Sequence, residues 1–144
     1  MPGPGAEHRP APEAGEALLN VIRFDENGLV PAVVQQADTG HVLMLGWMNR
    51  AAIARTLNTG QAHYWSRSRG FQWHKGEQSG FTQQVVEIRL DCDGDSLLLL
   101  VRQNGVACHS GRKSCWYSTV RDGRIAVMTE PDVDPAIMQH ESHH

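Results

Sequence analysis

The strongest constraint on the fold is a strict alternation of apolar and charged side chains over residues 86–93. Successive side chains of a β-strand point to opposite faces, so the pattern predicts a strand with one face in the core and one face carrying charge. The turn-forming run Asp-Gly-Asp-Ser at 93–96 leads into an apolar run at 97–102, which predicts a second strand. The apolar side of the first strand carries Val86, Ile88, Leu90 and Cys92.

The rest of the chain favours short strands around one helix. Further strands are predicted at 29–35 and 41–45, joined as a hairpin, and at 62–69, 116–120 and 125–128. Asn49 and Gly60 are good N- and C-caps for the one main helix between them. Residues 70–80 are predicted to form a loop or lid, and Asn104–Gly105 a further hairpin turn. We therefore expect a mainly β or α+β fold, a β-rich single domain of short antiparallel strands.

Length and composition are those of one soluble globular domain. The chain has 144 residues, of which 40% are hydrophobic and 20% charged, enough to bury one core. We expect a disordered leader at 1–16, the folded domain at 17–130 and a flexible tail at 131–144. A net charge of -3 argues against broad nucleic-acid binding, and no 18-residue apolar run suggests a membrane span. The leader lacks the apolar core of a secretory signal, which predicts a cytoplasmic location.

All three cysteines, Cys92, Cys108 and Cys115, fall within one stretch of the chain. In a reducing compartment clustered cysteines more often bind metal than form disulfides, and a disulfide would leave one thiol over. Three cysteines cannot complete a four-cysteine structural zinc site, whereas a zinc with three protein ligands keeps a position open for water. The spacing matches neither a zinc ribbon nor a zinc deaminase. The count favours a catalytic zinc site over three scattered thiols.

The same stretch carries three acids at alternating positions, Asp91, Asp93 and Asp95. Closely spaced carboxylates suit hard cations such as magnesium, but an acidic turn without a metal has the same appearance. A calcium-binding EF-hand loop that begins at Asp91 is excluded, because it needs glycine where Ser96 stands and glutamate where Arg102 stands. The residue pattern leaves a hard-metal site and a plain acidic turn both open.

Other candidate residues have both a functional and a structural interpretation. His109 follows Cys108 directly and is a candidate fourth ligand, a general base, or a loop histidine without a role. The segment 62–69 is either a solvated edge strand or a strand that binds phosphate and a base, with arginines for oxygens and an aromatic ring for stacking. The side chains that would do so are Trp65, Arg67 and Arg69.

Five motifs, in the same order along the chain, closely resemble the phosphoribosyl-AMP cyclohydrolase family of histidine biosynthesis. They are Val-Leu-Met-Leu-Gly-Trp-Met-Asn at 42–49, His-Tyr-Trp-Ser-Arg-Ser-Arg-Gly at 63–70, Trp-His-Lys-Gly-Glu at 73–77, Arg-Leu-Asp-Cys-Asp-Gly-Asp at 89–95 and Ala-Cys-His-Ser-Gly-Arg-Lys-Ser-Cys at 107–115. The resemblance extends from about Val30 to Tyr117 and does not cover the two ends. One departure is Phe81, where many family members place histidine or asparagine after Ser-Gly.

The resemblance implies hydrolytic opening of the adenine ring of phosphoribosyl-AMP at the N1–C6 bond. It further implies one Zn²⁺ per subunit, a requirement for Mg²⁺, and an intertwined homodimer whose zinc site takes thiolates from both chains. By motif match, zinc would be held by Cys92, Cys108 and Cys115, and magnesium by Asp91, Asp93 and Asp95. His109 is the expected proton shuttle. The candidate substrate-binding residues are Trp65, Arg67, Arg69, Lys75, Arg112 and Lys113.

Two other classes of protein are compatible with parts of the pattern. A deaminase acting at a related purine carbon would use the same kind of activated water but would release ammonia. A zinc-stabilised module without activity would be expected to supply a fourth cysteine or histidine at finger-like spacing, which this sequence lacks. The cyclohydrolase interpretation is therefore preferred.

Overall fold

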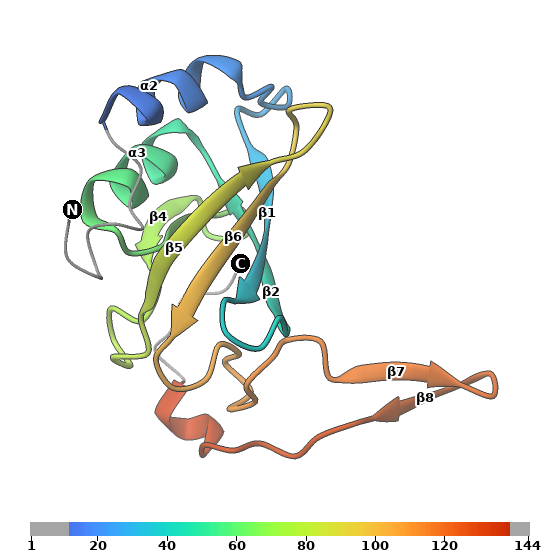
Figure 1. Cartoon of the computed structure of the whole chain (residues 1–144). Helices are drawn as coiled ribbons and strands as arrows, with labels where there is room; N and C mark the ends of the chain where they lie inside the picture. The colour runs from blue at the N-terminus through green and yellow to red at the C-terminus, as the bar shows by residue number, and fades with distance from the viewer. Residues whose placement is uncertain (1–11, 139–144) are drawn as a thin grey trace.

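The computed structural model describes residues 12–138 and contains a four-stranded sheet with two helices beside it (Figure 1). The sheet is built from β1 (Val30–Gln36), β2 (Val42–Met48), β5 (Gln83–Leu90) and β6 (Leu97–Gln103). Two further strand pairs are β3 (His63–Ser66) with β4 (Phe71–His74), and β7 (Ser118–Arg121) with β8 (Arg124–Val127). The helices are α2 (Pro12–Val21), α3 (Arg50–Thr59) and the 3-10 helix η1 (Pro135–Met138). The predicted β-rich α+β class is confirmed.

The strand order of the main sheet is β2-β1-β6-β5. The two predicted hairpins, β1–β2 and β5–β6, are both antiparallel as expected. The central pair β1–β6 is parallel, with Ala32 opposite Leu97, so the prediction of purely antiparallel strands was wrong at this position. Parallel neighbours need a long connection. Here the chain between β1 and β6 runs through β2, α3, the β3–β4 pair and β5. The predicted hairpin at Asn104–Gly105 does not form, because β1 and β5 already occupy both edges of β6.

Helix α3 begins and ends at the predicted caps. The side chain of Asn49 accepts a hydrogen bond from the backbone N–H of Ala52 at 2.9 Å. Gly60 adopts a left-handed φ of 76°, and its N–H donates to the Thr56 carbonyl.

The prediction of a single main helix was wrong, because α2 also forms. It begins at Pro12, so residues 12–16 of the predicted leader are helical, and its Leu18 and Leu19 pack against the core. Gly15 is buried against Leu57 of α3, which explains why a segment rich in small residues is held as a helix. The remaining leader residues, 1–11, and tail residues 139–144 lie outside the described part of the chain.

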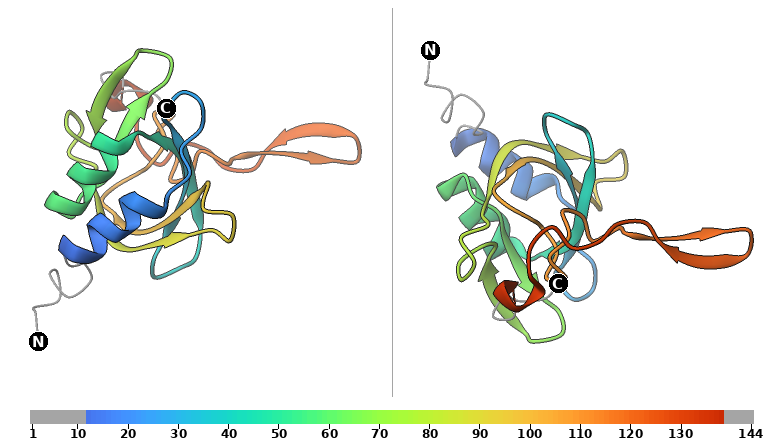
Figure 2. Two further views of the ribbon diagram at one scale, coloured as in Figure 1. Left: turned by 90° about the horizontal axis from the view of Figure 1, so that it is seen from above. Right: turned by 90° about the horizontal axis from the view of Figure 1, so that it is seen from below.

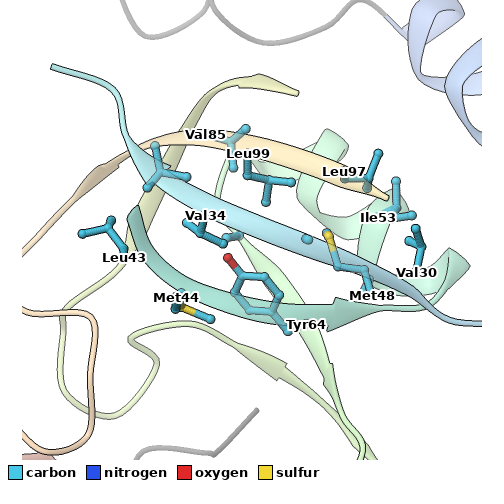
Figure 3. Close-up of a cluster of buried hydrophobic side chains, with 14 of the residues drawn as sticks. Val30, Val34, Leu43, Met44, Met48, Ile53, Tyr64, Val85, Leu97 and Leu99 are labelled. Carbon is cyan, nitrogen blue, oxygen red and sulfur yellow. The ribbon is translucent and has the colours of Figure 1, made fainter. Parts of the chain in front are cut away.

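The hydrophobic core lies between the main sheet, α3 and the β3–β4 pair (Figure 3). Alternate residues of the central strands, among them Val30, Val34 and Leu99, are fully buried. Tyr64 of β3 is also fully buried, and its hydroxyl donates to Gln83 Oε1 at 2.6 Å. Gln83 in turn donates from Nε2 to Gln103 Oε1 at 2.8 Å, so this polar group inside the core is satisfied.

The region predicted as a long strand and a lid is a short hairpin. β3 ends at Ser66, and residues 67–70 form a turn closed by a hydrogen bond from Gly70 N–H to the Ser66 carbonyl. β4 then pairs antiparallel with β3, so residues 71–74 of the expected lid are sheet. Alternation beyond Ser66 suggested a longer strand, but Gly70 takes a positive φ of 71° and turns the chain there.

The β7–β8 hairpin, called the arm below, projects away from the body (Figures 1 and 2). Its turn at Asp122–Gly123 and its two strands were predicted. Its apolar side chains are unusually exposed: Val120 is 71% and Ile125 78% exposed. The chain then returns to the body, where Met138 of η1 is fully buried within the predicted tail. Among the described residues, no helix is long and apolar enough to cross a membrane.

Candidate metal centre

The three acids gather in the turn between β5 and β6, called the acid turn below. One carboxylate oxygen from each of Asp91, Asp93 and Asp95 lies within 4.8 Å of the others, and all three residues are exposed. The predicted strand stops at Leu90 rather than continuing through Asp93, so the three acids lie in a turn and not along a strand. Carboxylate oxygens at this separation form a donor set for a hard divalent cation.

Hydrogen bonds within the acid turn fix its shape. Asp91 Oδ1 accepts from the backbone N–H groups of Asp95 and Ser96, at 3.0 and 3.2 Å. A hydrogen bond from the Ser96 side chain is the main cause that lowers the pKa of Asp91, so this carboxyl is held ionised. Gly94 is buried with a φ of 75°, and its carbonyl accepts from Arg23 N–H at 2.7 Å. The acid turn is therefore anchored to the segment that follows α2.

Cys108 and Cys115 lie together in the loop that follows β6, called the cysteine loop (residues 107–115) below. Backbone hydrogen bonds from Cys108 N–H to the Arg112 carbonyl and from Cys115 N–H to the Leu43 carbonyl fold the loop and tie it to β2. Ser110 donates to the Cys108 sulfur from its hydroxyl at 3.1 Å. Sulfur that accepts several hydrogen bonds is stabilised as a thiolate, the form that binds metal.

The two thiols of this loop are hydrogen-bonded to each other, and their pKa values shift in opposite directions. A hydrogen bond from Cys115, with Ser110 as a second donor, lowers the pKa of Cys108 to about 5 against the opposing effect of burial. The same hydrogen bond and burial raise the pKa of Cys115, while the ammonium of Lys75 acts in the opposite direction. The lowered pKa of Cys108 favours its thiolate form. This sulfur pair fits a soft cation such as zinc.

Cys92 does not join this pair within one chain. It is exposed in the acid turn, whereas the cysteine loop follows the other end of β6 (Figure 1). Seven strand residues separate the two ends, which is roughly 20 Å at the usual rise per residue. Within residues 12–138 the only group of three or more metal-binding side chains is the acid turn. The three predicted zinc ligands are therefore two neighbours and one distant residue.

The other predicted site residues fall into two sets. His109 is exposed next to the thiolate, and its charge contributes to the lowered pKa of Cys108. In the same loop the Arg112 guanidinium lies 4.0 Å from the Tyr117 ring centroid and donates to the Thr129 carbonyl at 2.7 Å. Lys113 is exposed, with its Nζ 4.0 Å from Asp132.

The second set lies around β3 and β4. Trp65 is half-buried, and Arg67 and Arg69 are exposed in the turn after β3. The guanidinium of Arg67 lies 4.1 Å from the ring centroid of Trp47. Lys75 is only 2% exposed, and its Nζ lies 5.8 Å from the Trp73 ring centroid, so it faces the interior of the chain. Phe81 is partly buried and packs over Gly105.

Two features near the cysteine loop were not predicted from the sequence. A cleft of about 570 Å³ lies beside it, lined in part by His41, Trp116 and Tyr117. Residues 132 and 133, in the predicted tail, donate backbone hydrogen bonds to the Gly111 carbonyl at 2.9 and 3.0 Å. The adjacent aromatic pair after Cys115 was a usable signal for the cleft, but the tail contact depends on the path of the arm and has no local pattern.

Comparison with known proteins identifies the family. The profile of the phosphoribosyl-AMP cyclohydrolase family matches residues 44–117. A phosphoribosyl-AMP cyclohydrolase of Rhodospirillum centenum is 59% identical over 118 residues, which cover 82% of this chain and 89% of the relative. The enzyme of Granulibacter bethesdensis is 56% identical over 82% of this chain and 93% of the relative. That of Hydrogenovibrio crunogenus is 52% identical over 83% of this chain and 82% of the relative. The chain thus belongs to the phosphoribosyl-AMP cyclohydrolase family of enzymes.

Proposed function

We propose that this protein catalyses the hydrolytic opening of the adenine ring of 1-(5-phosphoribosyl)-AMP. Water adds to C6, the C6–N1 bond breaks with its electron pair going to N1, and N1 takes a proton. The product is the formimino-carboxamide ribotide intermediate of histidine biosynthesis. The observation that carries the proposal is relatedness of more than 50% identity over most of the chain to proteins named for this reaction. A cytoplasmic location is proposed with it, because the thiols must stay reduced.

We propose one zinc per subunit, held by Cys92, Cys108 and Cys115. The fit is supported by the thiolate character of Cys108 and by its contact with Cys115. Bound zinc would act as a Lewis acid that activates the attacking water. Asp91, Asp93 and Asp95 would hold magnesium, and the distance between their oxygens supports this. A magnesium there would neutralise a substrate phosphate that bare carboxylates would repel.

The zinc ligands are proposed to come from two chains of an intertwined homodimer. Because Cys92 lies at the opposite end of β6 from the cysteine loop, a partner subunit is the natural source of the third thiolate. The exposed apolar arm supports association, since side chains such as Ile125, 78% exposed, gain by being covered. Each acid turn would then lie next to the cysteine loop of the other subunit.

His109 is proposed to move the proton. It lies in the cysteine loop next to Cys108 and is exposed, so it can reach both the attacking water and the substrate. An imidazole group, whose ordinary pKa is close to neutral pH, can take a proton from water and deliver it to N1. The candidate phosphate partners are Arg67, Arg69, Arg112 and Lys113, and Trp65 is one candidate for base stacking. Lys75 is not kept among them, because it is 2% exposed and faces the interior of the chain.

The proposal is tested by assaying the purified protein with phosphoribosyl-AMP and substituting His109→Asn. The wild-type protein is expected to give the ring-opened product without release of ammonia. His109→Asn should lower kcat by about a hundredfold or more, the usual contribution of a general acid–base, with zinc and magnesium content unchanged. Ammonia as a product would contradict the reaction, and unchanged turnover in His109→Asn would contradict the role of the histidine.

A further inference from the structure

A cleft lies beside the cysteine loop, next to candidate zinc ligands. It lies at the base of the arm, and Ser114 and Trp116, the two neighbours of Cys115, both line it. Its volume of about 570 Å³ is in the range of small-molecule sites. Its walls are mostly apolar, with Val42 and Met128 among the lining residues. A flat, largely apolar ligand would therefore fit, between residues that are next to Cys115 in the chain.

Trp116 lines this cleft, and hydrogen bonds hold its backbone in place. The backbone N–H of Trp116 donates to Ser114 Oγ at 2.9 Å, and the same hydroxyl donates to the Val42 carbonyl at 2.8 Å. Tyr117 is held by Arg112, and its carbonyl accepts from Met128 N–H at 2.7 Å, which closes the base of the arm. Trp116 is nevertheless 55% exposed. An aromatic residue that lines a cleft and leaves about half of its surface open can serve as a platform for a nucleobase.

The cleft also has a polar end. His41 and Lys113 line both this cleft and an adjoining hollow of about 300 Å³. Lys113 is exposed, and its 4.0 Å contact with Asp132 is a surface contact of little strength. An ammonium there suits a phosphate group of a nucleotide whose base lies on the aromatic wall.

We propose that Trp116 stacks on the adenine ring of the substrate and that Lys113 contacts one of its phosphates. This inference rests on the proposed function and makes it more specific. It assigns base stacking to Trp116 rather than to Trp65, the ring suggested by sequence alone. Trp65 lies on β3 and is not among the residues that line this cleft.

The test uses the metal-loaded enzyme and its Trp116→Leu, Trp116→Phe and Lys113→Met variants. Inhibition constants for AMP and for adenosine, KM for phosphoribosyl-AMP, zinc content and oligomeric state are measured for each. Trp116→Leu is expected to weaken AMP and adenosine alike by about tenfold or more, and Trp116→Phe much less, because a smaller aromatic face remains. Lys113→Met should weaken AMP but not adenosine, and the effect should shrink at high salt.

Several outcomes would overturn the assignment. The inference is wrong if Trp116→Leu binds AMP as tightly as wild type, or if Trp65→Leu causes the loss instead. The cleft would instead be an interface between copies of the chain if two results occur together. Trp116→Leu would have to become monomeric, and Trp116→Phe and Lys113→Met would have to leave AMP and adenosine binding unchanged. Turnover of phosphoribosyl-AMP by the wild-type enzyme is measured separately. If the wild-type enzyme opens no adenine ring, the proposed function itself is rejected, and the inference that rests on it is rejected as well.

Discussion

His63 and His74 face each other across β3 and β4, with ring centroids 4.5 Å apart and ring planes 11° apart. Both rings contact Gln61: His63 Nδ1 lies 2.8 Å from its carbonyl oxygen, and His74 Nε2 lies 2.6 Å from its Oε1. Because both Gln61 atoms are acceptors, each of these ring nitrogens carries a hydrogen. Two stacked, half-buried imidazoles can be neutral together, but two charged ones would repel each other.

Burial is the main cause that lowers the pKa of His63 below 6.5, and the charges of His74 and Arg55 act in the same direction. The hydrogen bond to Gln61 and the charge of Glu77 oppose this shift. With a pKa lower in the folded state, the unfolded chain binds more protons at mildly acidic pH, so the free energy of unfolding rises with pH there. The contribution of His63 to the free energy of unfolding is complete above about pH 6.5. It is lost as the pH falls through the pKa of His63 in the folded state.

His63→Gln should therefore make stability less dependent on pH. We expect the free energy of unfolding of wild type to fall between neutral pH and mild acid more steeply than that of the variant, measured by urea denaturation across the pH range. Arg55→Gln serves as the matched comparison, because it removes only one of the minor causes and should give a slope close to wild type. Parallel curves for wild type and His63→Gln would contradict the interpretation.

At the scale of elements, the cysteine loop depends on its contact with the returning chain. Gly111 has a φ of 84°, and a Cβ placed there would lie 1.9 Å from the Val133 carbonyl oxygen. The backbone of this chain segment therefore approaches too closely for any other residue. Since Gly111 lies between Cys108 and Cys115, displacement of the segment would also disturb the sulfur pair.

Gly111→Ala is expected to destabilise the protein by more than about 2 kcal/mol, from strain at positive φ together with the clash. The matched control is Gly28→Ala, which has a similar φ of 74° but nothing within 4 Å of the added Cβ. It should cost only about 1 kcal/mol. Urea denaturation measures both variants, and zinc per chain should fall in Gly111→Ala alone. Equal losses of stability in the two variants would show that the contact with Val133 contributes nothing.

Elements whose determinants are local were predictable from the sequence. The caps of α3 lie at Asn49 and Gly60, and the turns of three hairpins carry glycine or aspartate at the expected places. Helix α2 was not, because packing on α3 rather than its own composition holds it. Nor was the parallel β1–β6 pair, which joins residues about 65 positions apart.

The same distinction holds for the candidate site. The spacing of Asp91, Asp93 and Asp95 was enough to predict a cluster, since one turn brings them together. The spacing of the cysteines suggested one centre, but the direction of β6 separates Cys92 from Cys108. Lys75 illustrates a third limit. Its position in a predicted loop and its motif made it a candidate substrate-binding residue, whereas the fold buries it over Trp73.

At the scale of the whole molecule, one chain presents the residues of the proposed metal centre at two separate places. The sulfur pair lies at one end of the sheet, and the acid turn with Cys92 lies at the other. In the proposed two-fold dimer, the cysteine loop of each subunit meets the acid turn of the other, because contacts across a two-fold axis are reciprocal. The activity of each site then depends on residues of both subunits. A site built within one chain would not show this dependence.

Mixing two inactive variants tests this directly. Cys92→Ser and Cys108→Ser homodimers should each bind little zinc and lack activity. Equal amounts of the two variants are unfolded and refolded together, so that half of the dimers contain one chain of each variant. Each of these mixed dimers has one intact site out of two. About one quarter of wild-type activity and zinc binding should therefore return. The control mixes Cys108→Ser with Cys115→Ser. Both changes lie in the same cysteine loop, so every site of a mixed dimer lacks a ligand and no activity should return. If the first mixture also stays inactive although mixed dimers form, the ligands do not come from two chains.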